Sequence, residues 1–308
     1  MTLLRRAFTV AEAVLPDRVT FAIEDQAHTV RFDRRARAFR REHGFQPAAR
    51  TLTILTYPDD VVHHPDILLG KLCAALGYRT TFNPRRPFDV AVKYHDQTFT
   101  DPSALAPIPA GRPVINAGSL DISKVRVDRE FEAVFGMSTL LDPSTHVGPM
   151  VEKPDLNSAQ GRSLVTGPMA PRPGFVYQRL LDSTTGDGRY VEYRVPIHDG
   201  RFPLVYRKTM QEEARFTKVA ERAEIIEPEA DFSADELDRV RTMCRAMGLD
   251  YGELDVIRDR ESGVPVVIDV NNTPYGALKG LDETERRRAI RTLAASFQTM
   301  CESRLPSS

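Results

Sequence analysis

The sequence contains no tryptophan, only three cysteines and almost no net charge. The cysteines, Cys73, Cys244 and Cys301, stand far apart and belong to no CxxC or Cys/His cluster, which argues against a structural zinc site. A disulfide framework is equally unexpected, and scattered cysteines are typical of a reducing compartment. The formal charge of −1 provides no long-range attraction to nucleic acid or to an anionic membrane.

Long apolar runs are also missing, and none approaches the length of a membrane span. The first residues carry arginines but no apolar core and no small-residue cleavage site, so no secretory signal is expected. What is present is an ordinary globular composition, with 41% hydrophobic and 28% charged residues in a chain of 308. We therefore expect a cytoplasmic protein with no nucleic-acid and no membrane partner.

The first 50 residues are the hardest to interpret. Val19–Ile23 and His28–Phe32 alternate weakly between apolar and polar residues, which predicts a hairpin. Asp33–His43 is strongly basic and predicts a helix whose charges face solvent. Residues 51–116 then run strand, helix, strand, which indicates a small α/β domain with a parallel sheet. Its expected strands are Thr51–Tyr57, Tyr78–Phe82, Phe88–Lys93 and Pro113–Asn116, and its expected helix is Pro65–Gly77.

The rest of the chain mixes strands and helices without an internal repeat. A helix is expected over Asp121–Gly136, with Asp121 as its N-cap and Gly136 as its stop. The other expected helices are Asp235–Gly248 and Asp282–Leu305, and the expected strands are Gly148–Lys153, Ser163–Thr166, Phe175–Leu180, Tyr190–Ile197, Phe202–Lys208, Tyr251–Arg258 and Val264–Asn271.

The most informative segment is YGELDVIRDRESGVPVVIDVNNTPYG, residues 251–276. Two apolar strands flank a polar turn, which predicts a hairpin. Ser262 lies midway between Asp255 and Asp269, so the two aspartates should stand opposite, or nearly opposite, each other. Asn271 is two residues beyond Asp269 and should point to the same face.

Like charges that face each other in a sheet repel, and a hard divalent cation offsets that repulsion. Asp255 and Asp269 are each embedded in apolar runs, LDVI and VVIDV, which is an unusual context for a surface charge. The pattern therefore favours a Mg²⁺ site at Asp255, Asp269 and Asn271. The alternatives are a solvent-facing Asp255 and a simple turn at residues 271–274.

Several basic residues could hold phosphate near this hairpin. Lys124 begins a helix after a loop, and Lys153 ends a strand before a small, polar segment that could close over phosphates. Arg194 and Lys208 lie on two strands joined by a turn, and Arg194 could face the aspartates or form an ion pair with Glu192. Each of these signals is weak alone, since most single lysines are surface residues.

The segment FVYQRLLD, residues 175–182, could be an ordinary buried strand or could offer backbone hydrogen bonds to adenine. In the second interpretation, Asp182 would reach the ribose.

Taken in order, these features resemble the ATP-grasp superfamily. The order is a lysine on a helix, a lysine on a strand before a loop, a hinge strand, basic strands and a D…(E/D)xN hairpin followed by proline. The hairpin is similar to that of D-alanine–D-alanine ligases, and Arg194 followed by a turn and a basic pair looks like RimK-type ligases. The resemblance covers roughly residues 114 to 300.

This resemblance implies an α/β (α+β) protein with the ATP-grasp fold: a small N-terminal α/β domain and two α+β subdomains that sandwich ATP. The expected divisions are an extension (1–50), a preceding α/β domain (51–118) and an ATP-grasp domain (119–303), split into lid-bearing (119–180) and metal-binding (181–303) parts. By the same resemblance, Lys124 and Lys153 contact ATP, and Gln178 to Leu180 contact its adenine. Asp255, Asp269 and Asn271 are expected to hold two Mg²⁺ ions.

The resemblance implies a carboxylate–amine ligase that forms an acyl phosphate, with Arg194 and Lys208 as catalytic residues. The acceptor would be a small molecule or a peptide, and a homodimer is possible because many relatives are dimers. The alternatives are an ATP-grasp kinase and a nucleotide-binding regulatory protein. Two departures stand out: Asp269 replaces the usual Glu, and Glu253 stands where D-alanine–D-alanine ligases have an arginine, which disfavours dipeptide formation of that kind.

Overall fold

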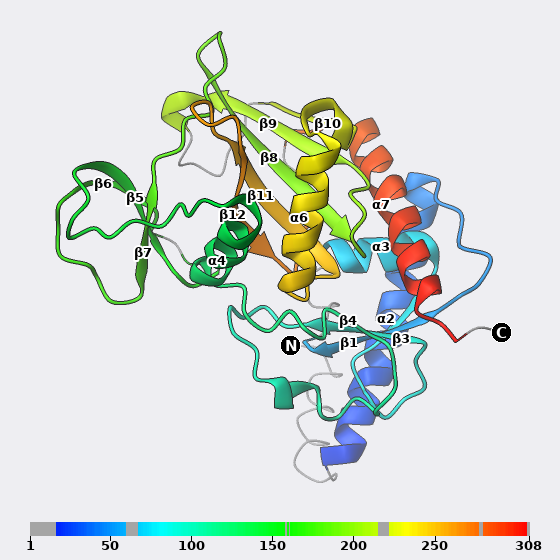
Figure 1. Ribbon diagram of the computed structural model, residues 1–308. Coiled ribbons are helices and arrows are strands. Elements are labelled where there is room, and N and C mark those ends of the chain that lie inside the picture. The colour runs from blue at the N-terminus through cyan, green and yellow to red at the C-terminus, as the bar shows by residue number, and fades with distance from the viewer. Residues whose placement is uncertain are drawn as a thin grey trace, which may run out of the picture.

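In the computed structural model, the chain forms three sheets, one parallel and two antiparallel (Figure 1). The structure describes residues 17–59, 67–157, 159, 161–214, 222–276 and 280–306. None of the helices in these ranges is long and apolar enough to cross a membrane. The predicted class, α/β with further α+β parts, is therefore confirmed.

The N-terminal sheet is parallel, with strand order β2-β1-β3-β4. Its strands are β1 (Thr53–Pro58), β2 (Arg79–Thr81), β3 (Val90–Tyr94) and β4 (Val114–Ile115), and its helices are α2 (Asp17–His43) and α3 (Leu68–Leu76), with a 3₁₀ turn η1 (Pro102–Leu105). Helix α3 ends as expected, because Gly77 adopts the left-handed conformation with φ 71°. Pro65, the expected start of this helix, lies outside the described residues.

The hairpin expected before residue 33 is wrong, because Asp17–His43 is one continuous helix of 27 residues. Its buried positions, Asp25, His28, Phe32 and Ala36, recur at helical spacing. Two of these residues are polar, which hid the period from the sequence. Asp25 accepts a hydrogen bond from Thr81 Oγ1 at 2.7 Å, so α2 is fixed to β2.

A second sheet of order β6-β5-β7 projects from the rest of the molecule on the left of Figure 1. Its antiparallel strands are β5 (Gly148–Pro154), β6 (Ser163–Gly167) and β7 (Phe175–Arg179), close to their expected ranges.

The third sheet is antiparallel, with strand order β10-β9-β8-β11-β12. Its strands are β8 (Arg189–His198), β9 (Val205–Gln211), β10 (Arg222–Ile226), β11 (Tyr251–Arg258) and β12 (Pro265–Asn271), with η2 (Glu212–Ala214) after β9. Strand β10 was not predicted, nor was the one-turn helix α5 (Pro228–Asp231).

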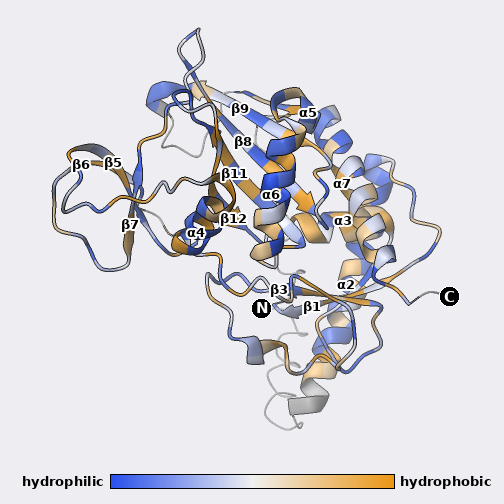
Figure 2. Ribbon diagram, viewed as in Figure 1, coloured by the Kyte–Doolittle hydropathy of each residue, from blue (hydrophilic) through white to orange (hydrophobic). Residues whose placement is uncertain are grey.

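Helices α4 (Lys124–Phe135) and α6 (Ala234–Ala246) share one core with the apolar face of this sheet, and Figure 2 shows the polar outer side of α6. The N-cap of α4 is Ser123 rather than Asp121, because the Ser123 hydroxyl accepts the Arg126 amide hydrogen. Asp121 instead accepts the amide hydrogen of Ser123. Gly136 ends α4 as expected, with φ 74°.

The C-terminal helix α7 (Glu283–Ser303) begins at its expected N-cap, Asp282. Its buried residues, among them Leu293 and Phe297, join the core of α2, α3 and the first sheet. The same core includes Tyr206 and Tyr251 of the third sheet. Helix α7 therefore bridges the N-terminal sheet and the large antiparallel sheet (Figure 1).

Candidate active site

The face of the third sheet opposite α4 and α6 carries a set of charged side chains. Asp255 on β11 pairs directly with Asp269 on β12, as the sequence predicts, and the register shifts immediately afterwards. Glu253, two residues earlier on β11, pairs with Asn271. Since side chains two residues apart share a face, three carboxylates and one amide lie on the same side of the β11–β12 hairpin.

Arg194 of β8 pairs with Asp255 across the sheet. Its Nε donates to Asp255 Oδ1 at 3.0 Å, and its Nη2 reaches Asp255 Oδ2 at 3.5 Å. Burial alone would raise the pKa of Asp255, but Arg194 and Lys208 outweigh it and lower this pKa to about 2. Asp255 is therefore ionised, and the expectation that Arg194 faces the aspartates agrees with its position.

Lys208 lies on β9, the strand next to β8, and forms an ion pair with Glu192 of β8. Its Nζ is also 3.9 Å from Asp255 Oδ1. The carboxylate of Glu192 thus holds Lys208 beside the aspartate pair. The sequence suggested an ion pair between Glu192 and Arg194, but in the structure Glu192 forms its ion pair with Lys208.

Two lysines approach Asp269 from other elements. Lys124, at the start of α4, places Nζ 3.8 Å from Asp269 Oδ1 and donates to the Leu156 carbonyl at 3.1 Å. Lys153 of β5 is buried, and burial lowers its pKa to about 8, with Asp269 acting in the opposite direction. The helix, the projecting sheet and the large sheet thus each contribute a charged group here.

The aspartate pair fits a hard divalent cation. Asp269 Oδ1 is buried and has no hydrogen-bond partner among the described residues, so this oxygen is available to coordinate a metal ion. The donors are carboxylate oxygens, and Mg²⁺ commonly takes one or two carboxylates while phosphate and water fill its remaining positions. The described residues contain no group of three or more His, Cys, Asp or Glu side chains placed to hold a metal, so water or a bound phosphate would supply the remaining ligands.

Asn271 differs from the two aspartates. Its Oδ1 accepts the Thr273 amide hydrogen at 2.9 Å and the Thr273 hydroxyl at 3.2 Å. This is the turn that the sequence offered as an alternative to a metal ligand. Metal coordination by Asn271 requires these hydrogen bonds to be shared or broken.

The residues expected at the adenine and the ribose lie at the end of β7 and in the connection to β8. Gln178 is buried on β7 and donates to Thr139 Oγ1 at 3.2 Å. Leu180 follows β7 and is half-buried, and Asp182 is exposed. Asp182 Oδ1 accepts hydrogen bonds from the amide and hydroxyl of Thr184 at 2.8 and 2.7 Å.

Two contributions to the site were missed from the sequence. Arg162, just before β6, acts electrostatically on both Asp255 and Lys153. Glu253 was noted only as a departure from a family pattern, yet it is buried beside Arg194. A basic residue directly after Gly161 in the polar loop was the available signal for Arg162.

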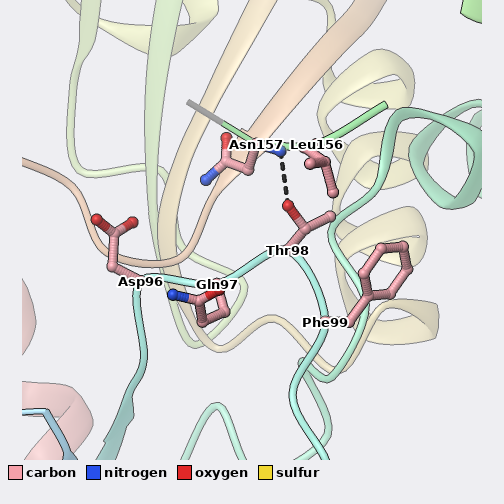
Figure 3. A pocket seen from close by; sticks show the side chains of 6 residues that line it. All are labelled: Asp96, Gln97, Thr98, Phe99, Leu156 and Asn157. Atoms are coloured by element: carbon pink, nitrogen blue, oxygen red, sulfur yellow. Dashed lines mark hydrogen bonds between the residues drawn. The ribbon is translucent and has the colours of Figure 1, made fainter. Parts of the chain in front are cut away.

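Two polar residues that follow strands of the N-terminal sheet, Asn116 and Asp96, differ in their surroundings. Asn116 is structural, because its side chain accepts the Asp250 and Tyr251 amide hydrogens and donates to the Tyr251 carbonyl. Asp96 instead lines an open cavity of about 340 Å³. Figure 3 shows this cavity between the loop after β3 and the loop after β5, where the Asn157 amide donates to Thr98 Oγ1 at 2.7 Å.

No protein-family model matches the chain, and no curated protein matches it. Solved structures do match across most of its length. One is the ATP-grasp ligase PsnB in complex with a minimal precursor, at 17% identity, with 82% of this chain and 100% of that chain covered and a TM-score of 0.55.

Two further matches are D-alanine–D-alanine ligase from Bacillus anthracis in complex with ATP and the D-cycloserine synthetase DcsG. The first has 16% identity, covers 84% of this chain and 99% of that chain, and has a TM-score of 0.50. The second has 14% identity, covers 82% and 99%, and also has a TM-score of 0.50. The chain therefore has the ATP-grasp fold, as the resemblance implied.

Proposed function

We propose that the protein is an ATP- and Mg²⁺-dependent ligase that joins a carboxylate to an amine. In the first step, a carboxylate oxygen of the substrate attacks the γ-phosphorus of ATP, the bond to the β–γ bridging oxygen breaks, and ADP leaves. In the second step, the amine attacks the acyl carbon, phosphate leaves, and the nitrogen gives its proton to solvent. Catalysis of this kind consists mainly of positioning and charge neutralisation.

The observation that carries the proposal is the meeting of acidic and basic groups from three elements at Asp255 and Asp269. Lys124 reaches Asp269, and Arg194 and Lys208 reach Asp255. Paired carboxylates surrounded by cations suit a metal-bound polyphosphate, since a metal ion held by the acids would neutralise the charge of the phosphates. An ordinary structural ion pair needs only one base for each acid.

In this proposal, Asp255, Asp269 and Asn271 hold two Mg²⁺ ions, which supply neutralisation of the phosphate charge when bound. Lys124 and Lys153 bind the phosphates, Gln178 to Leu180 bind adenine, and Asp182 approaches the ribose. Arg194 and Lys208 bind the transferred group. The lid-bearing part is 119–180 and the metal-binding part is 181–303.

The named structural neighbours support a ligase, because PsnB, D-alanine–D-alanine ligase and DcsG are all ligases or synthetases. PsnB has been captured with a precursor peptide, and with Mg and ADP, so a peptide acceptor belongs with small molecules among the candidates. The second candidate is a kinase on the same fold. It is carried by the same residues, and Arg194 and Lys208 favour the ligase because they suit a carboxylate substrate.

The test is ³¹P NMR of the protein with Mg·ATP and a panel of amino acids, peptides, hydroxy acids and sugars. Phosphate and ADP that appear only when a carboxylate and an amine are both present support the ligase. A stable phosphomonoester supports the kinase and contradicts the ligase. Mg-dependent ATP binding, measured on the same sample, separates a missing substrate from an incorrect proposal.

A further inference from the structure

Arg194 lies between two carboxylates on the same face of β11. Its Nε is 3.0 Å from Asp255 Oδ1, whereas its Nη1 is 3.7 Å from Glu253 Oε2. The first distance is that of a hydrogen-bonded ion pair, and the second is too long for a hydrogen bond. The guanidinium is therefore bonded to Asp255 and only adjacent to Glu253.

Glu253 is a buried acid whose hydrogen-bonding capacity is unused. It is 2% exposed, and neither of its carboxylate oxygens has a hydrogen-bond partner within the described part of the chain. Two other buried glutamates are fully engaged: Glu192 pairs with Lys208, and Glu152 accepts from Arg172 and the Tyr177 hydroxyl. A buried carboxylate without a bonded partner is costly, so its position next to Arg194 requires a reason.

The proposed metal site supplies that reason. A divalent cation needs the oxygens of Asp255, and Arg194 now approaches both of them, at 3.0 and 3.5 Å. The guanidinium and the metal ion compete for the same oxygens and repel each other. Binding of the metal therefore favours movement of the Arg194 guanidinium toward another acidic side chain, and Glu253 Oε2 is 3.7 Å from its Nη1.

We infer that Arg194 leaves Asp255 when a divalent cation binds there and pairs with Glu253, which serves as its positioning residue. This inference rests on the proposed function, because it takes Asp255 as a metal ligand. Without metal, Arg194 neutralises Asp255 and limits its repulsion with Asp269. With metal, Glu253 holds one edge of the guanidinium, and the remaining N–H donors of the planar fork face the phosphates.

The test is the binding of Mn²⁺ to metal-free, nucleotide-free protein, with free Mn²⁺ counted by electron paramagnetic resonance. Glu253→Gln removes the second anion, so Arg194 stays on Asp255, and Mn²⁺ affinity should fall ~10-fold, the usual scale for outer residues of metal sites. The matched control is Glu152→Gln, which replaces another buried glutamate, one that pairs with the exposed Arg172 on the projecting sheet, and should leave Mn²⁺ affinity unchanged.

A double-mutant cycle separates two ways in which Glu253 could strengthen Mn²⁺ binding: by pairing with Arg194, or by attracting the cation directly with its negative charge. In an Arg194→Leu background Glu253 has no guanidinium to pair with. Glu253→Gln should then change Mn²⁺ affinity by less than about twofold. An equal loss in both backgrounds, or wild-type affinity in Glu253→Gln alone, overturns the inference. If Glu253→Gln does not fold, Glu253→Asp, which withdraws the anion by one methylene, should weaken Mn²⁺ binding, and unchanged binding overturns the inference.

Asp255→Asn distinguishes this inference from the proposed function. If Asp255→Asn binds Mn²⁺ like the wild type, the metal site itself is wrong. If Asp255→Asn loses Mn²⁺ and Glu253→Gln does not, only the exchange of Arg194 is wrong.

Discussion

Buried polar groups lie in opposite environments near the two ends of the segment over which β8 and β11 pair, which runs from Tyr193–Val256 to His198–Tyr251. At one end, Asp255 is held by Arg194 and Lys208, and its pKa falls to about 2. At the other end, His198 has no hydrogen-bond partner on either ring nitrogen among the described residues, and burial lowers its pKa to about 3. Its ring stacks on Tyr251, with centroids 5.3 Å apart, within an apolar core that includes Phe297.

The comparison shows what distinguishes a site from a core on one continuous sheet. Burial without an opposite charge makes a group neutral, as it does at His198. Burial beside fixed opposite charges keeps Asp255 ionised and concentrates charge in one place. The first end therefore suits a charged ligand, whereas the second end stabilises the junction with α7.

The largest expected effect is at the charged end. Asp255→Asn should lower turnover ~10³-fold or more, because a carboxylate proposed to hold Mg²⁺ is lost while the side-chain volume is kept. The measurement is ADP release with the substrates identified by ³¹P NMR, together with circular dichroism to verify the fold. Asp235→Asn, at a carboxylate that is 72% exposed on α6, is the matched control and should be fully active. Wild-type ATP consumption by Asp255→Asn would falsify the metal assignment.

The core end should show the reverse result. Phe297→Ala removes a fully buried ring between α7 and the large sheet and should cost about 3–5 kcal/mol of unfolding free energy. Turnover per folded molecule should stay near that of the wild type, because Phe297 lies away from the charged groups. Urea unfolding and activity at low temperature measure the two quantities, with exposed Thr299→Ala on the same helix as control. Loss of activity in the folded variant would mean that the two ends are not independent.

A smaller effect depends on pH. The folded-state pKa of His198 is about 3, below its ordinary value of 6.5, so the unfolded chain binds the proton first as pH falls. The stability associated with neutral His198 is therefore complete above pH 6.5 and is lost as pH falls toward 3, at about 1.4 kcal/mol per pH unit.

His198→Phe removes this titration. The variant should gain about 3 kcal/mol relative to the wild type between pH 7 and pH 4, as urea unfolding at each pH would show. Tyr251, its stacked neighbour, does not titrate in this range, because burial raises its pKa well above 10. A difference between variant and wild type that stays constant with pH would contradict the burial of a neutral His198.

More features of the charged end than of the core end could be predicted from the sequence. Strand β11 matches its expected range, and Asp255 stands opposite Asp269, because apolar alternation and a short turn fix the register locally. The pairing of Lys208 with Glu192, and the place of Glu253 beside Arg194, depend on the register between strands far apart in the sequence. No local pattern encodes that register.

The N-terminal error has a different physical cause. Asp25 and His28 are buried polar residues that hydrogen-bond to Thr81 and Thr80, so a hydrophobic period of 3.6 could not be read there. The bridging position of α7 was likewise not predicted, since an amphipathic helix face does not indicate which elements it packs against. Tertiary partners, rather than local propensity, decided both outcomes.

The smallest expected effect concerns Asp182, near the opposite edge of the proposed nucleotide site. Its carboxylate is exposed and accepts two hydrogen bonds from Thr184, so ribose binding would have to compete with this local turn. Asp182→Ala should therefore raise the KM for ATP by less than about threefold, since the carboxylate is exposed to water and already accepts hydrogen bonds from Thr184. Comparing ATP with 2′-deoxy-ATP and 3′-deoxy-ATP identifies any direct ribose contact. If the variant loses a wild-type preference for ATP over the deoxy analogues of about tenfold or more, Asp182 binds the ribose despite Thr184.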